Sequence, residues 1–242
     1  MNLILFERSE ASETGEIALT GARAEHLLCV LKVKPGQPVR VGIVDGPRGT
    51  ATVASVAEGI VHLHCAFDSG TVPAPRVDLL LALPRPKVMR RLWAQIAALG
   101  VGRIILTNAE RVERNYFDTH VLTPACYRPL LVEGLQQARD TSLPRVSIHR
   151  QFKVLIEDEL DALFPHGLRL VADPSAATLA SSRAPMPGER VLLAVGPEGG
   201  WNAFETQLLE AHGFQPVGMG PRTLRTDTAC VALLALVHAT LA

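Results

Sequence analysis

The N-terminal part of the chain contains short stretches in which hydrophobic and polar residues alternate, which is the pattern of half-buried β-strands. These stretches cover residues 39–44, 50–56 and 60–67. The first two flank the turn-forming sequence Asp45-Gly46-Pro47-Arg48-Gly49, which suits a hairpin. Residues 22–31 instead have helical spacing, with Leu27 and Leu31 on one side. We expect a small β-barrel with one helix.

Beyond residue 76, strand patterns alternate with helix patterns. Strands are expected at residues 77–83, 103–107, 146–149, 168–172, 191–195 and 215–219. One helix should cover residues 87–99 and end at Gly100, and a second should end near Arg139, with Pro129 either beginning or kinking it. Residues 191–195 are apolar throughout, as in a strand that is covered on both faces. The pattern predicts an α/β domain with a mainly parallel sheet.

The two parts are joined by Thr71-Val72-Pro73-Ala74-Pro75-Arg76, in which two prolines favour an extended connection. We place the domain boundary there. Residues 1–72 are predicted to form the barrel domain, and residues 73–242 the α/β domain.

Composition indicates a globular protein, since 48% of the 242 residues are hydrophobic and 20% are charged. The first apolar run is too short for a secretory signal, and residues 229–242 are fewer than the roughly 20 that span a bilayer. They are interpreted as a buried terminal helix. The four cysteines are far apart, and His62 and His64 should face away from Cys65 on a strand. We expect a cytoplasmic protein with reduced thiols, no membrane partner and no metal.

The formal net charge is zero, although the charges are unevenly distributed. A basic cluster contains Arg76, Arg85, Lys87, Arg90 and Arg91, and an acidic cluster contains Glu157, Asp158, Glu159 and Asp161. The acidic cluster is interpreted as a solvated helix face.

The sequence Gly196-Pro197-Glu198-Gly199-Gly200-Trp201-Asn202 follows the apolar strand and precedes a helix. Asn202 and Glu205 have the spacing of a capping box, which places free backbone donors at the end of this loop. Gly199 and Gly200 permit positive φ and a close approach of a ligand to the backbone. The loop is either a ligand loop or a tight strand-to-helix connection.

A second loop, residues 218–229, contains two glycines, two arginines and three threonines. Thr226 or Asp227 is the expected N-cap of the helix that follows. The chain lacks G-x-G-x-x-G after its first strand, G-x-x-x-x-G-K-[ST] and G-x-S-x-G, which argues against a Rossmann dinucleotide site, a P-loop and a nucleophile elbow.

Together the two loops resemble the paired C-terminal motifs of the RsmE family of SPOUT RNA methyltransferases. The matching residues are Gly196-Pro197-Glu198-Gly199-Gly200 and Met219-Gly220-Pro221-Arg222-Thr223-Leu224-Arg225-Thr226-Asp227-Thr228-Ala229. Further similar blocks are Pro86-Lys87-Val88-Met89, Leu99-Gly100-Val101, Glu110-Arg111, residues 133–139 and, in the barrel, Glu25-His26-Leu27 and Val44-Asp45-Gly46. The family commonly has isoleucine and glutamate where this chain has Thr223 and Asp227.

The resemblance implies a SPOUT-type parallel sheet with a C-terminal trefoil knot, preceded by a PUA-like RNA-binding barrel. It also implies a homodimer that uses S-adenosylmethionine to methylate uridine N3 in 16S rRNA of the small ribosomal subunit. By carry-over, the cofactor-binding residues are Ala172, Asp173, Gly196, Gly199, Gly200, Met219, Gly220, Leu224, Arg225 and Thr226.

Two residues are candidates for catalysis. The N3 atom is a poor nucleophile until its proton leaves and negative charge spreads over the base. Arg225, at the start of a helix, could stabilise this charge. Glu198 could orient the base or accept the proton, or it could only hydrogen-bond within the loops.

The predicted RNA-binding residues are Arg23, His26 and Arg40 in the barrel and Lys87, Arg90 and Arg91 in the second domain. Two alternatives stay open at this point. One is a SPOUT methyltransferase with another RNA target, such as a ribose 2′-hydroxyl. The other is a ribosomal-RNA-binding assembly protein without catalysis.

Overall fold

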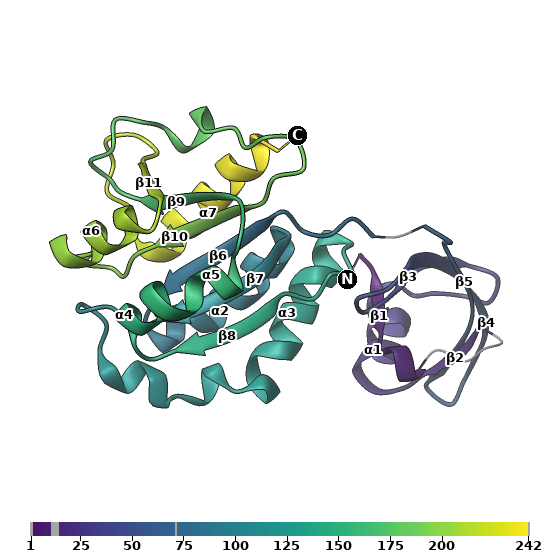
Figure 1. The fold of residues 1–242 in the computed structure, drawn as a ribbon. Helices are drawn as coiled ribbons and strands as arrows, with labels where there is room; N and C mark the ends of the chain where they lie inside the picture. The colour runs from purple at the N-terminus through teal and green to yellow at the C-terminus, as the bar shows by residue number, and fades with distance from the viewer. Residues whose placement is uncertain (1, 11–14, 71, 242) are drawn as a thin grey trace. The chain divides into compact units, whose positions relative to one another are not determined.

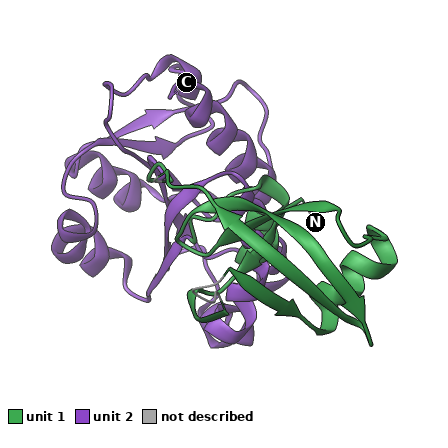
Figure 2. Ribbon diagram, turned by 90° about the vertical axis from the view of Figure 1, so that its right-hand side faces the viewer, with its two compact units in different colours: residues 1–74, 131–143 green, residues 75–130, 144–242 purple. Residues whose placement is uncertain are grey.

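The computed structural model describes residues 2–10, 15–70 and 72–241. The chain divides into two compact units, Met1–Ala74 with Leu131–Leu143 and Pro75–Leu130 with Pro144–Ala242 (Figure 2). Thr71 and Ala242, which begin the expected connector and end the expected terminal helix, lie outside the described residues. No helix in the described ranges combines the length and the apolar character needed to cross a membrane.

The first unit contains a five-stranded sheet in the order β1-β3-β4-β5-β2 (Figure 1). Its strands are β1 (Ile4–Phe6), β2 (Glu16–Leu19), β3 (Pro38–Ile43), β4 (Arg48–Ala57) and β5 (Ile60–Phe67). Only the β1–β3 pairing is parallel among those described, and β3 and β4 form the predicted hairpin. The expected helix is helix α1 (Gly21–Glu25), which continues into a π-helical segment, η2 (His26–Val30).

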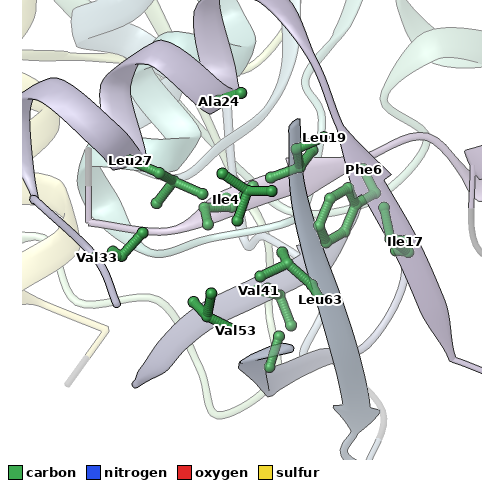
Figure 3. Packing of buried hydrophobic residues seen from close by; sticks show 12 residues of the cluster. Ile4, Phe6, Ile17, Leu19, Ala24, Leu27, Val33, Val41, Val53 and Leu63 are labelled. Carbon is green, nitrogen blue, oxygen red and sulfur yellow. The ribbon is translucent and has the colours of Figure 1, made fainter. Parts of the chain in front are cut away.

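The core of the first unit lies between this sheet and the helix (Figure 3). Alternate residues of β4 and β5, including Val53 and Leu63, are buried, as the alternating pattern predicts. Leu27 is fully buried against them, and Phe6 of β1 joins the same cluster.

Residues 131–143 join the first unit through the tip of the hairpin. Asp45 has a φ of 53°, and its amide donates to the carbonyl of Thr141 at 2.8 Å. The Asp45 Oδ1 accepts from the Leu143 amide at 2.8 Å, and the buried Thr141 hydroxyl donates to Gly46 at 2.7 Å. The turn residues therefore do more than reverse the chain, because they also hold a segment distant in sequence.

The second unit contains a six-stranded sheet in the order β11-β9-β10-β6-β7-β8, and every described pairing in it is parallel (Figure 1). Its strands are β6 (Val77–Ala82), β7 (Val101–Thr107), β8 (Arg145–His149), β9 (Leu168–Ala172), β10 (Val191–Val195) and β11 (Phe214–Val217). Every residue of β6 and β10 is buried, because both strands are central and covered on both faces. The predicted parallel sheet is confirmed.

Helices cover both faces of this sheet (Figure 1). The α-helices that follow α1 along the chain are α2 (Pro86–Ala98), α3 (Pro124–Ala138), α4 (Phe152–Val154), α5 (Leu160–Leu163), α6 (Ala203–Ala211) and α7 (Thr226–Ala239). The last residues of α3 belong to the first unit. A π-helical segment, η5 (Leu155–Glu159), connects α4 to α5, and short 3₁₀ segments are η1 (Arg8–Glu10), η3 (Arg114–Asp118), η4 (His120–Leu122) and η6 (Ala180–Ser182). Side chains from α4 to α6 pack on one face. Helices α2 and α7 contact each other, and α2 also contacts β7 whereas α7 contacts β6 and β10.

The central strands carry one buried ion pair. Asp78 on β6 is 1% exposed, and both of its carboxylate oxygens accept from the Arg190 guanidinium at 2.7 Å. Arg190 directly precedes β10, and its side chain is 41% exposed. The pair connects two neighbouring strands at their amino ends, far from the carboxyl ends where ligands bind in parallel sheets.

This ion pair gives an asymmetric prediction. Arg190→Ala should lower the free energy of unfolding by about 3–5 kcal/mol, because Asp78 would keep its charge where water does not reach. Asp78→Ala should cost only about 1–2 kcal/mol, because water can then solvate the half-exposed guanidinium. Urea denaturation followed by tryptophan fluorescence reports on the second unit, which contains Trp93 and Trp201. A larger loss for Asp78→Ala would contradict this interpretation.

Candidate functional site

A pocket of about 340 Å³ lies at the carboxyl ends of β9 and β10. It is lined by Val171, Ala172, Asp173, Pro174, Val195, Gly196, Pro197, Glu198, Gly199, Gly200, Trp201, Thr206, Thr223, Leu224, Thr226 and Ala229. The segments that line it follow parallel strands that are neighbours in the sheet, so their loops meet at one edge. Both glycine-containing loops predicted from the sequence contribute to this pocket.

The loop after β10 is a tight turn that leads into α6. The Gly200 amide donates to the Pro197 carbonyl at 2.8 Å, and Gly200 has a φ of 71°. Asn202 is the N-cap of α6 and accepts from the Glu205 amide at 2.8 Å, while the Glu205 carboxylate accepts from the Asn202 amide at 2.8 Å. The predicted capping box is confirmed.

The three glycines of this loop are required for different reasons. Gly200 has a positive φ, which an L side chain rarely adopts. Gly199 does not use that conformational freedom, but a Cβ added to it would lie 2.7 Å from Cδ of Arg111. A Cβ at Gly196 would lie 3.2 Å from the ring of Trp201. The sequence permits a positive φ at both Gly199 and Gly200, but of these two residues only Gly200 has one.

Glu205 connects this loop to the loop that follows β7. Glu205 is buried, with 3% of its surface exposed, and its Oε1 accepts from the Glu110 backbone amide at 2.7 Å. The neighbouring Arg111 donates from its guanidinium to the carbonyl of Gly199. No local pattern of residues predicted Glu110-Arg111 at this position, and the only indication was the resemblance of that block to a family motif.

The loop around residues 217–218 is held by the segment that follows β9. The Asp173 amide donates to the Val217 carbonyl at 3.0 Å, and the Gly218 amide donates to the Thr178 carbonyl at 2.8 Å. A Cβ at Gly218 would lie 2.8 Å from a backbone oxygen of this segment, so a glycine is needed for the close approach. The Asp173 carboxylate accepts from the amide and the hydroxyl of Ser175, at 2.8 and 2.7 Å.

The N-cap of helix α7 lies one residue before Thr226 and two before Asp227, the two residues expected to cap it. Arg225 is the N-cap residue, and its side chain makes no capping hydrogen bond with the described residues. Thr226 is the first helical residue and is 4% exposed, whereas the Asp227 carboxylate pairs with Arg91 of α2 at 2.9 Å. The prediction of Thr226 or Asp227 as the cap was therefore wrong, because the Thr226 side chain is buried and Asp227 has a distant partner. Burial, with Asp227 nearby, raises the pKa of the Cys230 thiol to about 12, so this thiol stays neutral.

Most of the predicted cofactor residues line the pocket. These are Ala172, Asp173, Gly196, Gly199, Gly200, Leu224 and Thr226, together with the catalytic candidate Glu198. Met219, Gly220 and the exposed Arg225 lie in the loop between β11 and α7 but are not among the lining residues.

Sequence reasoning missed part of the apolar lining, including Val171, Val195 and Trp201. The ring of Trp201 lies 5.3 Å from that of Phe152, and its buried Nε1 has no hydrogen-bond partner among the described residues. The available signal was its position directly after the two glycines.

The predicted RNA-binding residues differ in their surroundings. Lys87, Arg90 and Arg91 are exposed on α2, and Arg91 pairs with Asp227. In the first unit, Arg40 is exposed on β3, and His26 begins the π-helical segment η2. Arg23 pairs with Glu10 and donates to the carbonyl of Leu5 at 3.1 Å, so its guanidinium contributes to the packing of that unit.

The buried carboxylate leads to a stability prediction. Glu205→Ala should lower the free energy of unfolding by about 2–4 kcal/mol, because the amides of Asn202 and Glu110 would lose their acceptor. The corresponding fall in Tm is roughly 5–10 °C for a chain of this size. Glu205→Gln should cost less, since one acceptor oxygen remains. Glu210→Ala, an exposed position on the same helix, is the control and should change stability by less than about 0.5 kcal/mol. Equal melting temperatures for Glu205→Ala and Glu210→Ala would contradict the role of the carboxylate.

Comparison with known proteins identifies the family. Residues 72–238 match the model of the RNA methyltransferase domain. The chain is 30% identical to the ribosomal RNA small subunit methyltransferase E of Treponema pallidum, over 99% of this chain and 92% of that protein. It is 27% identical to ribosomal RNA small subunit methyltransferase E 1 of Borreliella burgdorferi, over 96% of this chain and 95% of that protein.

A crystal structure of a ribosomal RNA small subunit methyltransferase E from Neisseria gonorrhoeae, bound to S-adenosyl methionine, has the same fold. The TM-score is 0.75 and the sequence identity 22%, over 96% of this chain and 95% of that one. The domain match and the full-length similarity to the Treponema protein establish that the chain belongs to the ribosomal RNA small subunit methyltransferase E family.

Proposed function

We propose that this protein transfers a methyl group from S-adenosylmethionine to N3 of a uridine in 16S rRNA of the small ribosomal subunit, in the cytoplasm. The observation that carries the proposal is the glycine-lined pocket at the carboxyl ends of β9 and β10. Family membership supports it, because the relatives are named as methyltransferases of small-subunit ribosomal RNA and the Neisseria structure is described as bound to S-adenosyl methionine.

The pocket residues fit this cofactor in size and chemistry. A volume of about 340 Å³ is within the usual range for small-molecule sites. The apolar side chains of Val171, Val195 and Leu224 suit the flat adenine ring, whereas backbone groups beside Gly196 and Gly200 can hydrogen-bond to polar atoms. Met219 and Gly220 complete the proposed cofactor-binding set. When bound, the cofactor supplies an electrophilic methyl group on a sulfonium.

The reactivity of the uracil base is assigned to two side chains. Loss of the N3 proton leaves negative charge on the two carbonyl oxygens of the ring. The exposed guanidinium of Arg225, at the N-terminus of α7, is suited to stabilise that charge. Glu198 is exposed at the rim of the pocket, where its carboxylate can orient the base or accept the proton.

The proposal includes three features of architecture. The C-terminal segment forms a trefoil knot, residues 1–72 form a PUA-like RNA-binding barrel, and residues 73–242 form the methyltransferase domain of a homodimer. Two large hydrophobic side chains are available to such an interface, since Phe204 on α6 and Leu224 in the pocket lining are 54% and 37% exposed. Phosphate contacts are assigned to Arg23, His26 and Arg40 in the barrel and to Lys87, Arg90 and Arg91 on α2.

The first test uses small ribosomal subunits from cells that lack this protein. Incubation with the purified protein and S-adenosylmethionine should produce 3-methyluridine, detected by mass spectrometry of the nucleosides. Arg225→Ala should reduce the single-turnover rate by about 100-fold, because one preorganised donor to the developing charge is removed. Arg225→Lys should recover part of the rate, since an ammonium supplies charge without the planar geometry of guanidinium.

Two controls make this test decisive. Light scattering should give Arg225→Ala the same mass as the wild type, and its melting temperature should be unchanged. A near-normal rate for Arg225→Ala would remove Arg225 from the chemistry. Binding of ribosomal RNA without affinity for S-adenosylmethionine in the wild type would instead favour a non-catalytic assembly protein.

The basic face of α2 gives a separate prediction. Simultaneous replacement of Lys87, Arg90 and Arg91 by alanine should weaken binding to small subunits and flatten its salt dependence, because fewer counterions are released from phosphates. Lys153→Ala is a suitable control, because this exposed lysine lies on α4 and not on α2, and it pairs with Glu157. Filter binding between about 50 and 200 mM salt measures both quantities. An unchanged affinity and slope would identify the cluster as a solvated helix face.

A further inference from the structure

The loop after β7 contains a tight turn whose first and last residues are buried and hydrogen-bonded to each other. The Val112 amide donates to the Ala109 carbonyl at 3.0 Å, and these two residues are 6% and 3% exposed. Glu110 and Arg111 therefore form the exposed tip of a turn with a buried base. We call residues 109–112 the β7 turn.

The backbone of the β7 turn is bonded to the start of α6. The Glu110 amide donates at 2.7 Å to the Glu205 carboxylate, which also accepts from the Asn202 amide. Since Asn202 lies only two residues after the Pro197–Gly200 turn, one buried side chain determines the spacing between the β7 turn and the pocket loop.

Arg111 makes the second connection, and Gly199 is what allows it. Its guanidinium donates to the Gly199 carbonyl, and its aliphatic stem lies flat against Gly199. A Cβ on Gly199 would lie 2.7 Å from Cδ, 3.5 Å from Cγ and 3.4 Å from Cβ of Arg111, and these are its three nearest atoms. A methyl group at position 199 would therefore displace Arg111 before it met any other described side chain.

An exposed arginine rarely stays in one place for a single hydrogen bond, because ordering its long side chain offsets most of the gain. Here the backbone of Arg111 is already fixed by the Glu110–Glu205 bond and by the buried Ala109 and Val112. Less conformational entropy is then lost when the side chain settles on Gly199. The contact can hold the pocket loop in one conformation.

We propose that Arg111 is a positioning residue for the Pro197–Gly200 loop, acting through Gly199. The role in cofactor binding rests on the proposed function, since Gly199 and Gly200 are assigned to the cofactor. Arg111 keeps the loop backbone in the binding conformation, so its loss weakens cofactor binding without changing the chemical step.

A double-mutant cycle tests this coupling directly. The variants are Arg111→Ala, Gly199→Ala and the double variant, with S-adenosylhomocysteine affinity measured by calorimetry. Each single change should weaken binding about tenfold. Since Gly199→Ala acts by displacing Arg111, it should add less than twofold once Arg111 is alanine. If Gly199→Ala weakens binding equally in both backgrounds, the two residues act independently and the proposal fails.

Kinetics separates positioning from a general structural effect. Arg111→Ala should raise the KM for S-adenosylmethionine about tenfold and leave kcat within threefold, and Arg111→Lys should recover part of the loss. Arg114→Ala is the matched control, because Arg114 is exposed and its side chain has no hydrogen bond or ion pair with the described residues. A reduced kcat with an unchanged KM would overturn the positioning role.

A measurement without any ligand distinguishes failure of this inference from failure of the proposed function. The Gly200 amide is bonded to the Pro197 carbonyl and reports on the loop. Its hydrogen exchange, followed by NMR in the free protein, should be at least tenfold faster in Arg111→Ala and unchanged in Arg114→Ala. Unchanged exchange in Arg111→Ala would refute the contact's role even if the wild type binds the cofactor. Faster exchange in a protein that binds no cofactor would support the contact and reject only the function.

Discussion

The carboxylate of Glu205 is withdrawn from water and bonded to backbone amides of two loops that follow different strands. Burial of a charged group is unfavourable unless hydrogen bonds replace its hydration. The Asn202 and Glu110 amides supply those bonds, and each lies where the regular secondary structure offers it no acceptor. The same two bonds therefore satisfy the carboxylate, the start of α6 and the β7 turn. As a result, the loops after β7 and β10 cannot move independently.

This constraint explains why the pocket lies where it does. In a parallel sheet, loops from the carboxyl ends of neighbouring strands lie close together, but closeness alone does not fix their spacing. Glu205 fixes the spacing of the loops after β7 and β10, and hydrogen bonds to Val217 and Gly218 fix that of the loops after β9 and β11. Glycine is needed where these backbones touch, at Gly218, or where a side chain crosses, at Gly199. The pocket is thus formed mainly by backbone geometry, which a bound ligand can meet closely.

Electrostatic balance also depends on contacts between distant residues. The chain carries equal numbers of acidic and basic residues, yet this neutrality is not uniform. Arg23 and Arg190 pair with carboxylates within their own units, whereas Lys87 and Arg90 remain exposed. Arg91 is exposed but paired with Asp227 at the start of α7. Arg23 and Arg91 would therefore have to share their charge between a carboxylate and a polyanion, whereas no described ion pair competes for Lys87 and Arg90.

The sequence by itself determined the features that depend on near neighbours. Alternation predicted β3, β4 and β5 of the first unit but not β1 or β2. The apolar run predicted the buried strand β10, and Asn202 with Glu205 predicted the capping box, because each involves residues a few positions apart. Tertiary structure decided the rest. It paired Asp227 with Arg91, 136 positions away, so that neither Thr226 nor Asp227 caps α7. It also gave Glu205 its second partner and brought Arg111 onto Gly199. Such contacts depend on strand order and loop path in space, and no local pattern of residues encodes these.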